Sequence, residues 1–322
     1  MWTTWRAATE RALYGDNGFY RRPGAGPAAH FRTSVHASPL FARAVLSLAR
    51  TCGLDTVVDV GAGRGELLTE LHRLDPTLGA IGVEVAGRPA ELAGAVGWTS
   101  ALPDVTGALV VANEWLDNIP VDLVEQTADG PRVVEVDPAG VERLGGPPED
   151  ADRRWLERWW PLTEVGARAE VGRPRDEAWA TVVASVRRGV AVAVDYSHDR
   201  ASRPPAGSFA AYRLGRQVPP VPDGSCDLTA HVALDACAAA GLAAGATSTA
   251  LTTQRVALRA LGQEVPVPSR EMAESDPAGY LTGLAAAGEV AELTARDGLG
   301  GFGWLVQGVG VPPPPGLAAL SR

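Results

Sequence analysis

The segment from Thr56 to Leu74 constrains the fold more than any other part of the chain. Thr56 to Val60 is a short run of apolar and β-branched residues, which is typical of a buried parallel strand. The turn Gly61-Ala62-Gly63-Arg64-Gly65 follows, and Glu66 to Leu74 then places leucines on one face of a helix. A strand, a glycine-rich turn and a helix in this order predict an α/β fold with a ligand at the turn.

The rest of the chain continues this alternation. Apolar runs predict strands at 80–85, 95–98, 107–112, 189–194 and 302–309, and helical spacing marks 38–50, 153–160, 176–188 and 228–240. Two runs within 121–136 flank Ala128-Asp129-Gly130 and predict a hairpin, whereas the Pro- and Gly-rich stretch 203–224 predicts a loop. The pattern predicts a Rossmann-like, mostly parallel sheet with an N-terminal helical arm and an inserted hairpin and helix subdomain.

This interpretation divides the chain into five parts. We expect an N-terminal arm and helix at 1–52, the first part of a Rossmann core at 53–120, an inserted substrate or partner subdomain at 121–175, the second part of the core at 176–311 and a flexible tail at 312–322.

Composition excludes several classes of function. The net charge of −9 argues against a nucleic-acid binder, although it suits a cationic substrate. The three cysteines, Cys52, Cys226 and Cys237, offer neither a disulfide framework nor paired zinc spacing, so we expect no metal. No apolar run approaches the roughly 20 residues that span a bilayer, and the N-terminus lacks the apolar core of a signal peptide. These features predict a cytoplasmic protein without membrane contact; a homodimer is compatible with them.

Three details narrow the class of ligand expected at the turn. Glu84 ends the next strand, 19 residues after Gly65, where an acid can accept hydrogen bonds from ribose hydroxyls. The turn is Gly-x-Gly-x-Gly and lacks the Gly-x-Gly-x-x-Gly spacing of dinucleotide sites. Asp59, in the preceding strand, would repel a pyrophosphate but attract the ammonium group of S-adenosylmethionine (SAM). A dinucleotide-dependent oxidoreductase and a tight turn without ligand are the alternatives.

Several motifs in order along the chain then resemble one family. They are Ala12-Leu13-Tyr14 with Gly18-Phe19-Tyr20, Phe31-Arg32-Thr33-Ser34, Ser38-Pro39-Leu40-Phe41, Val58 to Gly65, Ala112-Asn113-Glu114-Trp115-Leu116-Asp117-Asn118-Ile119-Pro120-Val121, Asp195-Tyr196, Asp227-Leu228-Thr229-Ala230-His231-Val232, and Thr253-Gln254 with Leu261-Gly262. The chain resembles the MidA-like SAM-dependent methyltransferases, whose mitochondrial members methylate an arginine in a complex I subunit during assembly. The resemblance implies a class I methyltransferase fold, with SAM as cofactor and S-adenosylhomocysteine as product.

The residues and the resemblance together indicate the cofactor site. We expect cofactor contacts from Thr33, Ser34, Asp59, Gly61, Gly63, Gly65, Glu84, Trp98, Asn113 and Glu114. Trp98 would stack near the adenine, although a core tryptophan is equally consistent with the sequence.

Carboxylates and one histidine are the expected catalytic residues. Glu114 and Asp117 follow one strand and Asp195 ends another, so we expect both groups at the ligand-binding edge of the sheet. Asp117 could instead cap a helix, and Asp195 could be a buried acid held by backbone N–H groups. His231 is a candidate base, or a structural histidine.

Four further residues are expected on the substrate side: His36, Trp115, Tyr196 and Asp227. Tyr196 could supply an aromatic wall for a flat guanidinium. Asp227 precedes a predicted helix, so an N-cap is the competing interpretation.

The resemblance implies methylation of an arginine side chain in a protein, and the expected carboxylates suit this function because a guanidinium needs carboxylates to orient it. The family usually has Glu where His36 stands and Gly where Ser197 stands, and Trp115 is unusual in its motif. These departures keep two alternatives open: methylation of a small molecule or short peptide, and a SAM-binding assembly factor with little catalysis.

Overall fold

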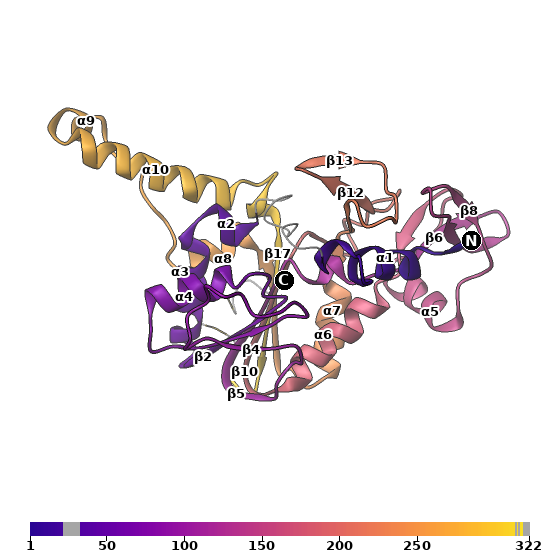
Figure 1. The fold of residues 1–322 in the computed structure, drawn as a ribbon, viewed down its shortest axis with the longest axis horizontal. Coiled ribbons are helices and arrows are strands. Elements are labelled where there is room, and N and C mark those ends of the chain that lie inside the picture. The colour runs from indigo at the N-terminus through magenta and orange to yellow at the C-terminus, as the bar shows by residue number, and fades with distance from the viewer. Residues whose placement is uncertain (22–32, 313, 315, 318–322) are drawn as a thin grey trace. The chain divides into compact units, whose positions relative to one another are not determined.

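The computed structural model describes residues 1–21, 33–312, 314, 316 and 317. Phe31, Arg32 and most of the expected tail at 312–322 lie outside the described residues. The chain forms two compact units (Figure 1). Unit 1 comprises Met1–Phe31, Ala112–Ser185 and Asp195–Ala246, and unit 2 comprises Arg32–Val111, Val186–Val194 and Thr247–Arg322. This grouping differs from the division expected along the chain, because each unit gathers three separate stretches.

A seven-stranded sheet forms the centre of unit 2, in the order β16-β17-β10-β5-β2-β3-β4. Its strands are β2 (Thr56–Val60), β3 (Gly79–Val83), β4 (Gly97–Thr99), β5 (Val105–Asn113), β10 (Val186–Asp195), β16 (Ser248–Thr253) and β17 (Gly303–Val309). β2 pairs with β3, and β3 with β4, in parallel. β16 and β17 pair antiparallel, so the expectation of a mostly parallel sheet needs correction at this edge. Antiparallel strands at the edge of a parallel sheet are common in α/β folds.

Helices accompany this sheet within unit 2. They are α2 (Ser34–Ala37), α3 (Pro39–Thr51), α4 (Glu66–Leu74), α8 (Gln254–Ala260), α9 (Arg270–Ser275), α10 (Pro277–Thr294) and the 3-10 helix η4 (Leu299–Gly301). α3 begins where the Ser38 side chain accepts a hydrogen bond from the Leu40 backbone N–H, with Pro39 at the first helical position. The buried Phe41 ring packs edge-on against Trp304, with centroids 5.9 Å apart.

Unit 1 contains the N-terminal arm and most of the remaining elements. They are β1 (Thr3–Thr4), α1 (Trp5–Tyr14), η1 (Phe19–Arg21), η3 (Leu116–Asn118), β6 (Leu123–Thr127), β7 (Gly130–Val136), β8 (Glu142–Leu144), α5 (Asp150–Trp159), β9 (Arg168–Glu170), α6 (Arg173–Ser185), β11 (Ser197–His198), β12 (Ala210–Arg213), β13 (Arg216–Val218), β14 (Asp227–Thr229), β15 (Val232–Ala233) and α7 (Leu234–Ala243). β6 and β7 form the predicted hairpin, with Val124 opposite Val133.

One region of unit 1 differs from the prediction. The expected loop at 203–224 contains the antiparallel strands β12 and β13, and the expected helix at 228–240 begins only at Leu234. Residues 227–229 are instead β14, because they pair with β12 and bury Leu228 against Trp5 and Leu13 of α1 in one apolar cluster. The N-cap interpretation of Asp227 is therefore wrong.

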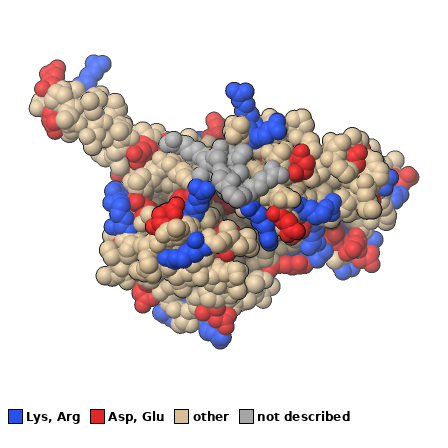
Figure 2. Space-filling model, in the orientation of Figure 1, with Lys and Arg blue, Asp and Glu red and all other residues tan. Residues whose placement is uncertain are grey.

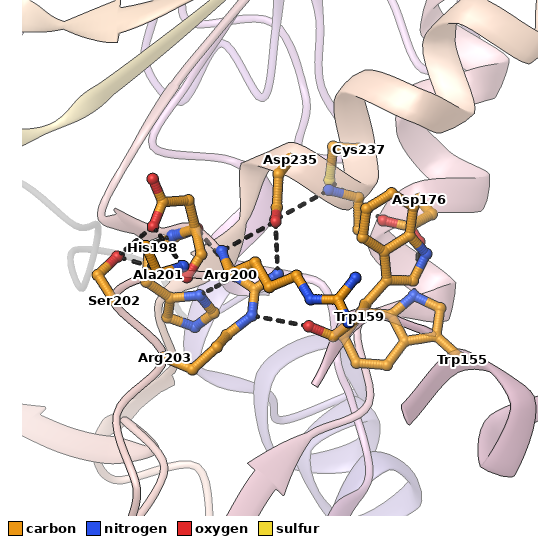
Figure 3. A network of polar contacts seen from close by, with 12 residues as sticks. Trp155, Trp159, Asp176, His198, Arg200, Ala201, Ser202, Arg203, Asp235 and Cys237 are labelled. Carbon is orange, nitrogen blue, oxygen red and sulfur yellow. Dashed lines mark hydrogen bonds and ion pairs between the residues drawn. The ribbon is translucent and has the colours of Figure 1, made fainter. Parts of the chain in front are cut away.

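A polar network holds α5 and the loop after β11 onto α6 and α7 (Figure 3). Asp176 accepts hydrogen bonds from Trp155 Nε1 at 2.6 Å and from the Cys237 thiol at 3.4 Å. The mostly buried Arg203 donates to both Asp235 oxygens and to the Trp159 carbonyl. Trp155 and Trp160 are buried in one apolar cluster and Trp159 packs against it, so all three tryptophans in 155–160 serve packing within unit 1.

Candidate functional site

The glycine-rich turn has the backbone that a closely approaching ligand requires. β2 ends at Val60 and α4 begins at Glu66, and Gly61, Gly63 and Gly65 all have positive φ angles, of 75°, 57° and 77°. A Cβ atom on Gly63 would meet nothing closer than Glu66 Oε2, at 3.5 Å, so the space beside it is open. Two backbone N–H groups of the turn donate to carboxylates, Gly63 to Glu84 and Arg64 to Glu66, each at 3.0 Å.

Two carboxylates flank this turn. Glu84, directly after β3, accepts hydrogen bonds from the backbone N–H of Gly63 at 3.0 Å and of Ala86 at 3.1 Å. Asp59 is 5% exposed, and burial raises its pKa to about 7, with further contributions from the Glu66 and Glu84 charges. A buried carboxyl without its own cation suits the ammonium group of SAM, and Glu84 suits the ribose hydroxyls. The residues present therefore fit the cofactor.

Trp98 lies on the same side of unit 2. Its ring covers Gly82, where an added Cβ would come within 2.5 Å, and it approaches the Cβ position of Gly65 at 3.5 Å. The indole Nε1 donates to the Ala86 carbonyl. Trp98 thus packs beside the turn, and its stacking on an adenine stays a prediction.

Ser34 and His36, which precede the first long helix and were both predicted as site residues, make different contacts. Ser34 is fully buried and donates to Oε1 of Gln254 at 3.0 Å. His36 contacts the Thr33 hydroxyl through Nδ1 at 2.6 Å and Glu66 through Nε2 at 3.3 Å. Burial raises the pKa of Glu66, but the hydrogen bond and charge of His36 together with backbone hydrogen bonds outweigh burial, so the net shift is downward. His36, expected on the substrate side, therefore lies in unit 2 beside the start of α4.

The acidic residues of the predicted catalytic site all belong to unit 1. We call Glu114, Asp117, Asp195 and Asp227 the acidic group. Glu114 follows β5 with a φ of 51°, which is uncommon for any residue other than glycine. Such strain persists where the surrounding structure requires it, and it concentrates at functional sites. The Asn113 side-chain amide donates to Oε1 of Glu114 at 3.3 Å.

Asp195, the last residue of β10, organises the segment after β5. Its Oδ2 accepts hydrogen bonds from the backbone N–H groups of Leu116 and Asp117, at 3.0 and 3.1 Å. It therefore fixes the start of η3, as one of the two interpretations of this residue predicted. Burial, followed by the neighbouring Asp117 charge, raises the pKa of Asp195 well above its ordinary value.

Three acceptor oxygens, two in the acidic group and one on the neighbouring Asn113, have no hydrogen-bond donor among the described residues. The Oδ1 atoms of Asn113, Asp117 and Asp195 are buried and lack a hydrogen-bond partner among the described residues. The other oxygen of Asp117 accepts from the Thr229 hydroxyl at 2.8 Å. Buried polar atoms without partners are rare in folded proteins, and they mark places where a ligand or a proton completes the structure.

Arg175 is the main residue that sequence reasoning missed. It is 3% exposed, and its guanidinium donates to the backbone carbonyls of Asp117, Ile119, Ala230 and His231. It thereby ties the η3 segment to the segment before β15. Nothing in the local sequence Arg173-Pro174-Arg175-Asp176 distinguishes this arginine from the surface arginines around it.

The N-terminal arm holds the other side of η3. The Tyr14 hydroxyl donates to the Asn118 carbonyl at 3.0 Å. The Tyr20 hydroxyl bonds Oδ1 of Asn118 at 2.7 Å and Oδ1 of Asp227 at 2.9 Å. Burial, then the Asp117 charge, raises the pKa of Asp227 to about 7. Asp227 therefore connects the arm to the acidic group.

Tyr196 and His231 form an aromatic pair, and the substrate role of Tyr196 stays a prediction. Their rings stack with centroids 5.6 Å apart and planes inclined by 17°, and Tyr196 is 37% exposed. Burial and the Arg175 charge lower the pKa of His231, so the imidazole is neutral near pH 7. Trp115 is half-buried just before η3, and its substrate role stays a prediction.

Charges of both signs are interspersed on the face drawn in Figure 2. Among the residues that the structure describes, no group of His, Cys, Asp or Glu is placed to hold a metal ion. No described helix is long and apolar enough to cross a membrane.

The α/β sheet, the glycine turn and the acids at the strand ends define an enzyme that binds a nucleoside-bearing cofactor. The family model described as "Putative S-adenosyl-L-methionine-dependent methyltransferase" matches residues 70–252, which is more than half of the chain. The chain belongs to this family.

Solved structures agree with this assignment. A COG1565 superfamily member from Burkholderia thailandensis, bound to S-adenosyl-homocysteine, is similar with a TM-score of 0.79 and 28% identity over 100% of this chain and 91% of that one. A native structure of a COG1565 superfamily protein from the same organism has a TM-score of 0.80 and 26% identity, covering 100% and 90%. Among curated proteins, none matches the sequence significantly. The protein is a SAM-dependent methyltransferase, and the predicted enzyme class and cofactor are confirmed.

Proposed function

We propose that this methyltransferase is MidA-like and transfers the methyl group to an arginine side chain of a protein. The observation that carries the proposal is the set of three buried oxygens, Oδ1 of Asn113, Asp117 and Asp195, that have no donor among the described residues. A guanidinium has five N–H donors in a fixed plane and no acceptor, so it can satisfy several such oxygens together.

The charge of the group supports a cationic acceptor. Four carboxyl groups, Glu114, Asp117, Asp195 and Asp227, share unit 1 with the buried guanidinium of Arg175, which donates its hydrogen bonds to backbone carbonyls. The stacked pair of Tyr196 and His231 adds a flat aromatic surface, on which a guanidinium packs well.

The same residues can manage the proton that the reaction releases. When bound, SAM supplies a methyl group on a sulfonium: the nitrogen–carbon bond forms, the carbon–sulfur bond breaks with its electron pair passing to sulfur, and the nitrogen loses one proton. Burial raises the pKa of Asp117, so its carboxylate accepts a proton more readily than an exposed one. The neutral His231 is a second acceptor.

The test is methyl transfer from SAM carrying a tritiated methyl group, with a lysate of the encoding organism as the source of acceptors. We expect label in protein, recovered as methylarginine after acid hydrolysis, and we expect Glu114→Gln to reduce it strongly. Label recovered in small molecules, on another amino acid, or nowhere would overturn the proposal. Exposed Glu157→Gln is the matched control and should leave the labelling unchanged.

A further inference from the structure

Unit 1 contains a cavity that the methyltransferase assignment leaves unexplained. Its volume is about 390 Å³, and its walls come from α1, β8, β9 and the loops at 206–209 and 220. This volume falls within the range of about 300–1,000 Å³ that is usual for small-ligand pockets. Trp5, Glu142, Arg168, Glu170 and Phe209 are the lining residues that carry chemical information, and we call the cavity the Trp5–Glu170 pocket.

Two aromatic rings form one side of the pocket. Trp5 and Phe209 lie with ring centroids 4.7 Å apart and planes inclined by 55°. Trp5 is 1% exposed and its Nε1 donates to Oε1 of Glu142 at 2.7 Å, so the indole cannot turn away. Fixed aromatic rings that line a cavity attract a cation through their quadrupoles.

Two carboxylates line the same cavity, and each is held in place. One oxygen of Glu142 accepts the hydrogen bond from Trp5 Nε1, and the other accepts a hydrogen bond from Arg168 Nη1 at 2.8 Å. Glu170 is 3% exposed and uses Oε1 to accept the backbone N–H groups of Ser208 and Phe209, at 2.7 and 2.9 Å. Its Oε2 has only the longer contact from the Ser208 hydroxyl, at 3.3 Å. Each carboxylate oxygen has two acceptor sites, so both acids retain capacity for another donor.

The local charge balance is negative. Arg168, the basic residue among the lining residues, already bridges Glu125 at 2.8 Å and Glu142 at 2.8 Å. The carboxyl groups of Glu125, Glu142 and Glu170 outnumber the two guanidinium groups that act on them, Arg168 on the first two and Arg175 on Glu170. An anionic ligand would be repelled here, whereas a guanidinium or ammonium group would meet both acceptor oxygens for its N–H groups and aromatic faces.

The pocket shares a residue with the aromatic pair of the candidate site. The Ser208 hydroxyl donates to Glu170 and accepts the backbone N–H of His231 at 2.9 Å. His231 in turn stacks on Tyr196. The wall of the pocket and the flat surface proposed for the acceptor arginine are therefore connected through one side chain.

We propose that the Trp5–Glu170 pocket binds a second basic side chain of the peptide substrate, an arginine or lysine near the methylated one in sequence or space. This inference rests on the proposed function, because it assumes a peptide acceptor. The pocket then selects substrates by the charge of a neighbouring residue and takes no part in the methyl transfer itself.

The experiment uses two probes that differ in charge but hardly in shape, N-acetyl-arginine amide and N-acetyl-citrulline amide. The protein carries 5-fluorotryptophan, and Trp5→Phe assigns the Trp5 fluorine signal. We expect the arginine probe to shift the Trp5 signal in a saturable way and the citrulline probe to leave it in place. Equal shifts with both probes, or no shift with either, would overturn the proposal.

Variants locate the binding. Glu142→Gln removes the charge and keeps one of the two acceptor oxygens, and it should weaken binding of the arginine probe about tenfold. Phe209→Leu should weaken it as well. Glu135→Gln, which pairs with Arg143 on the neighbouring strand, is the matched control and should change nothing. Binding that survives Glu142→Gln and Phe209→Leu would show that the probe sits elsewhere.

Failure of this inference is distinguishable from failure of the proposed function. Without methyl transfer to arginine, the Trp5 signal can still respond to the probe. Conversely, methylarginine can form in proteins while the Trp5 signal stays unmoved. Glu114→Gln should leave the Trp5 response intact, because Glu114 does not line the pocket.

Discussion

Oδ2 of Asp195 accepts a hydrogen bond from the backbone N–H of Asp117 at 3.1 Å, while the Oδ1 atoms of both side chains are buried without a partner among the described residues. Burial raises the pKa values of both carboxyl groups. One oxygen of Asp195 therefore stabilises the η3 segment. The other oxygen is buried without a donor, which disfavours the ionised form of the Asp195 carboxyl group.

Asp195→Asn should therefore change how stability depends on pH. The folded state holds a proton on Asp195 at pH values where the unfolded chain, with a pKa of about 3.9, has lost it. Stability contributed by the protonated acid is thus present at low pH and is lost as the pH rises from about 4 toward the raised pKa. Asparagine keeps the acceptor but cannot ionise, so the variant should gain stability relative to wild type as the pH rises.

Urea unfolding at pH 5 and pH 8 measures this difference, with about 1.4 kcal/mol expected for each pH unit between pH 5 and the raised pKa. The exposed Asp129→Asn in the β6–β7 turn is the control. A constant difference between wild type and Asp195→Asn at both pH values would contradict the linkage.

Arg175→Lys should destabilise the protein strongly. The guanidinium donates to four backbone carbonyls, and a lysine ammonium cannot reach them with the same planar geometry. Leaving buried carbonyls unpaired should cost about 2–4 kcal/mol of unfolding free energy, measured by urea denaturation. The exposed Arg154→Lys in α5 should cost less than about 0.5 kcal/mol, and a similarly small effect at Arg175 would contradict the structural role.

At position 114 a glycine variant should be more stable than an alanine variant, the reverse of the usual order in a helix. Its φ of 51° costs an L-residue about 1–2 kcal/mol but costs glycine little. Glu114→Gly should therefore be more stable than Glu114→Ala, whereas in the exposed helix position Glu157 alanine should be better by about 1 kcal/mol. Both changes at Glu114 should lower methyl transfer by roughly 10²–10⁴-fold. Retained transfer would remove Glu114 from the mechanism.

The pKa of Asp59 predicts a pH dependence of cofactor binding. An ammonium group near this carboxyl favours the ionised form, so binding must drive off the proton that Asp59 holds below about pH 7. The affinity for S-adenosylhomocysteine should fall as the pH drops below 7, approaching about tenfold per pH unit. 5′-Methylthioadenosine, which lacks the amino-acid group, should show little dependence in the same calorimetric titration, and equal slopes for both ligands would place the ammonium elsewhere.

Gly63 and Gly53 offer a matched comparison at the turn. Both have positive φ, 57° and 63°, so an alanine should cost each about 1–2 kcal/mol of stability. Only at Gly63 would the new methyl group enter the open space beside the cofactor turn. Gly63→Ala should weaken the binding of S-adenosylhomocysteine by at least about tenfold, and Gly53→Ala should leave this binding unchanged. Equal affinities of the two variants would show that the cofactor binds away from the turn.

Local sequence was sufficient for the cofactor turn, because strand, glycines and helix follow one another between Thr56 and Leu74. It was sufficient for the position of Asp195 too, since a carboxylate at the end of an apolar strand must lie at the sheet edge. It could not reveal Arg175, whose four acceptors are distant along the chain.

The strand at Asp227–Thr229 was missed for a similar reason. Its pairing partner is β12, and nothing within a few residues signals that pairing. The segment 244–301, to which we assigned no element, holds β16 and three helices. The longest of them, α10, is rich in alanine and has small residues on all sides, so it lacks the one-sided apolar spacing that marks a helix in sequence.

Neither compact unit is a continuous piece of the chain, since each gathers three stretches. On the ribosome, unit 1 cannot close until residues near Ala246 have emerged, and the sheet of unit 2 waits for β17 at residues 303–309. β5 therefore keeps one edge unpaired until β10 has emerged, and β10 keeps one edge unpaired until β17 has emerged. Cutting the chain at one place cannot release either unit as one fragment. A truncation from either end therefore removes part of one unit and leaves that unit incomplete.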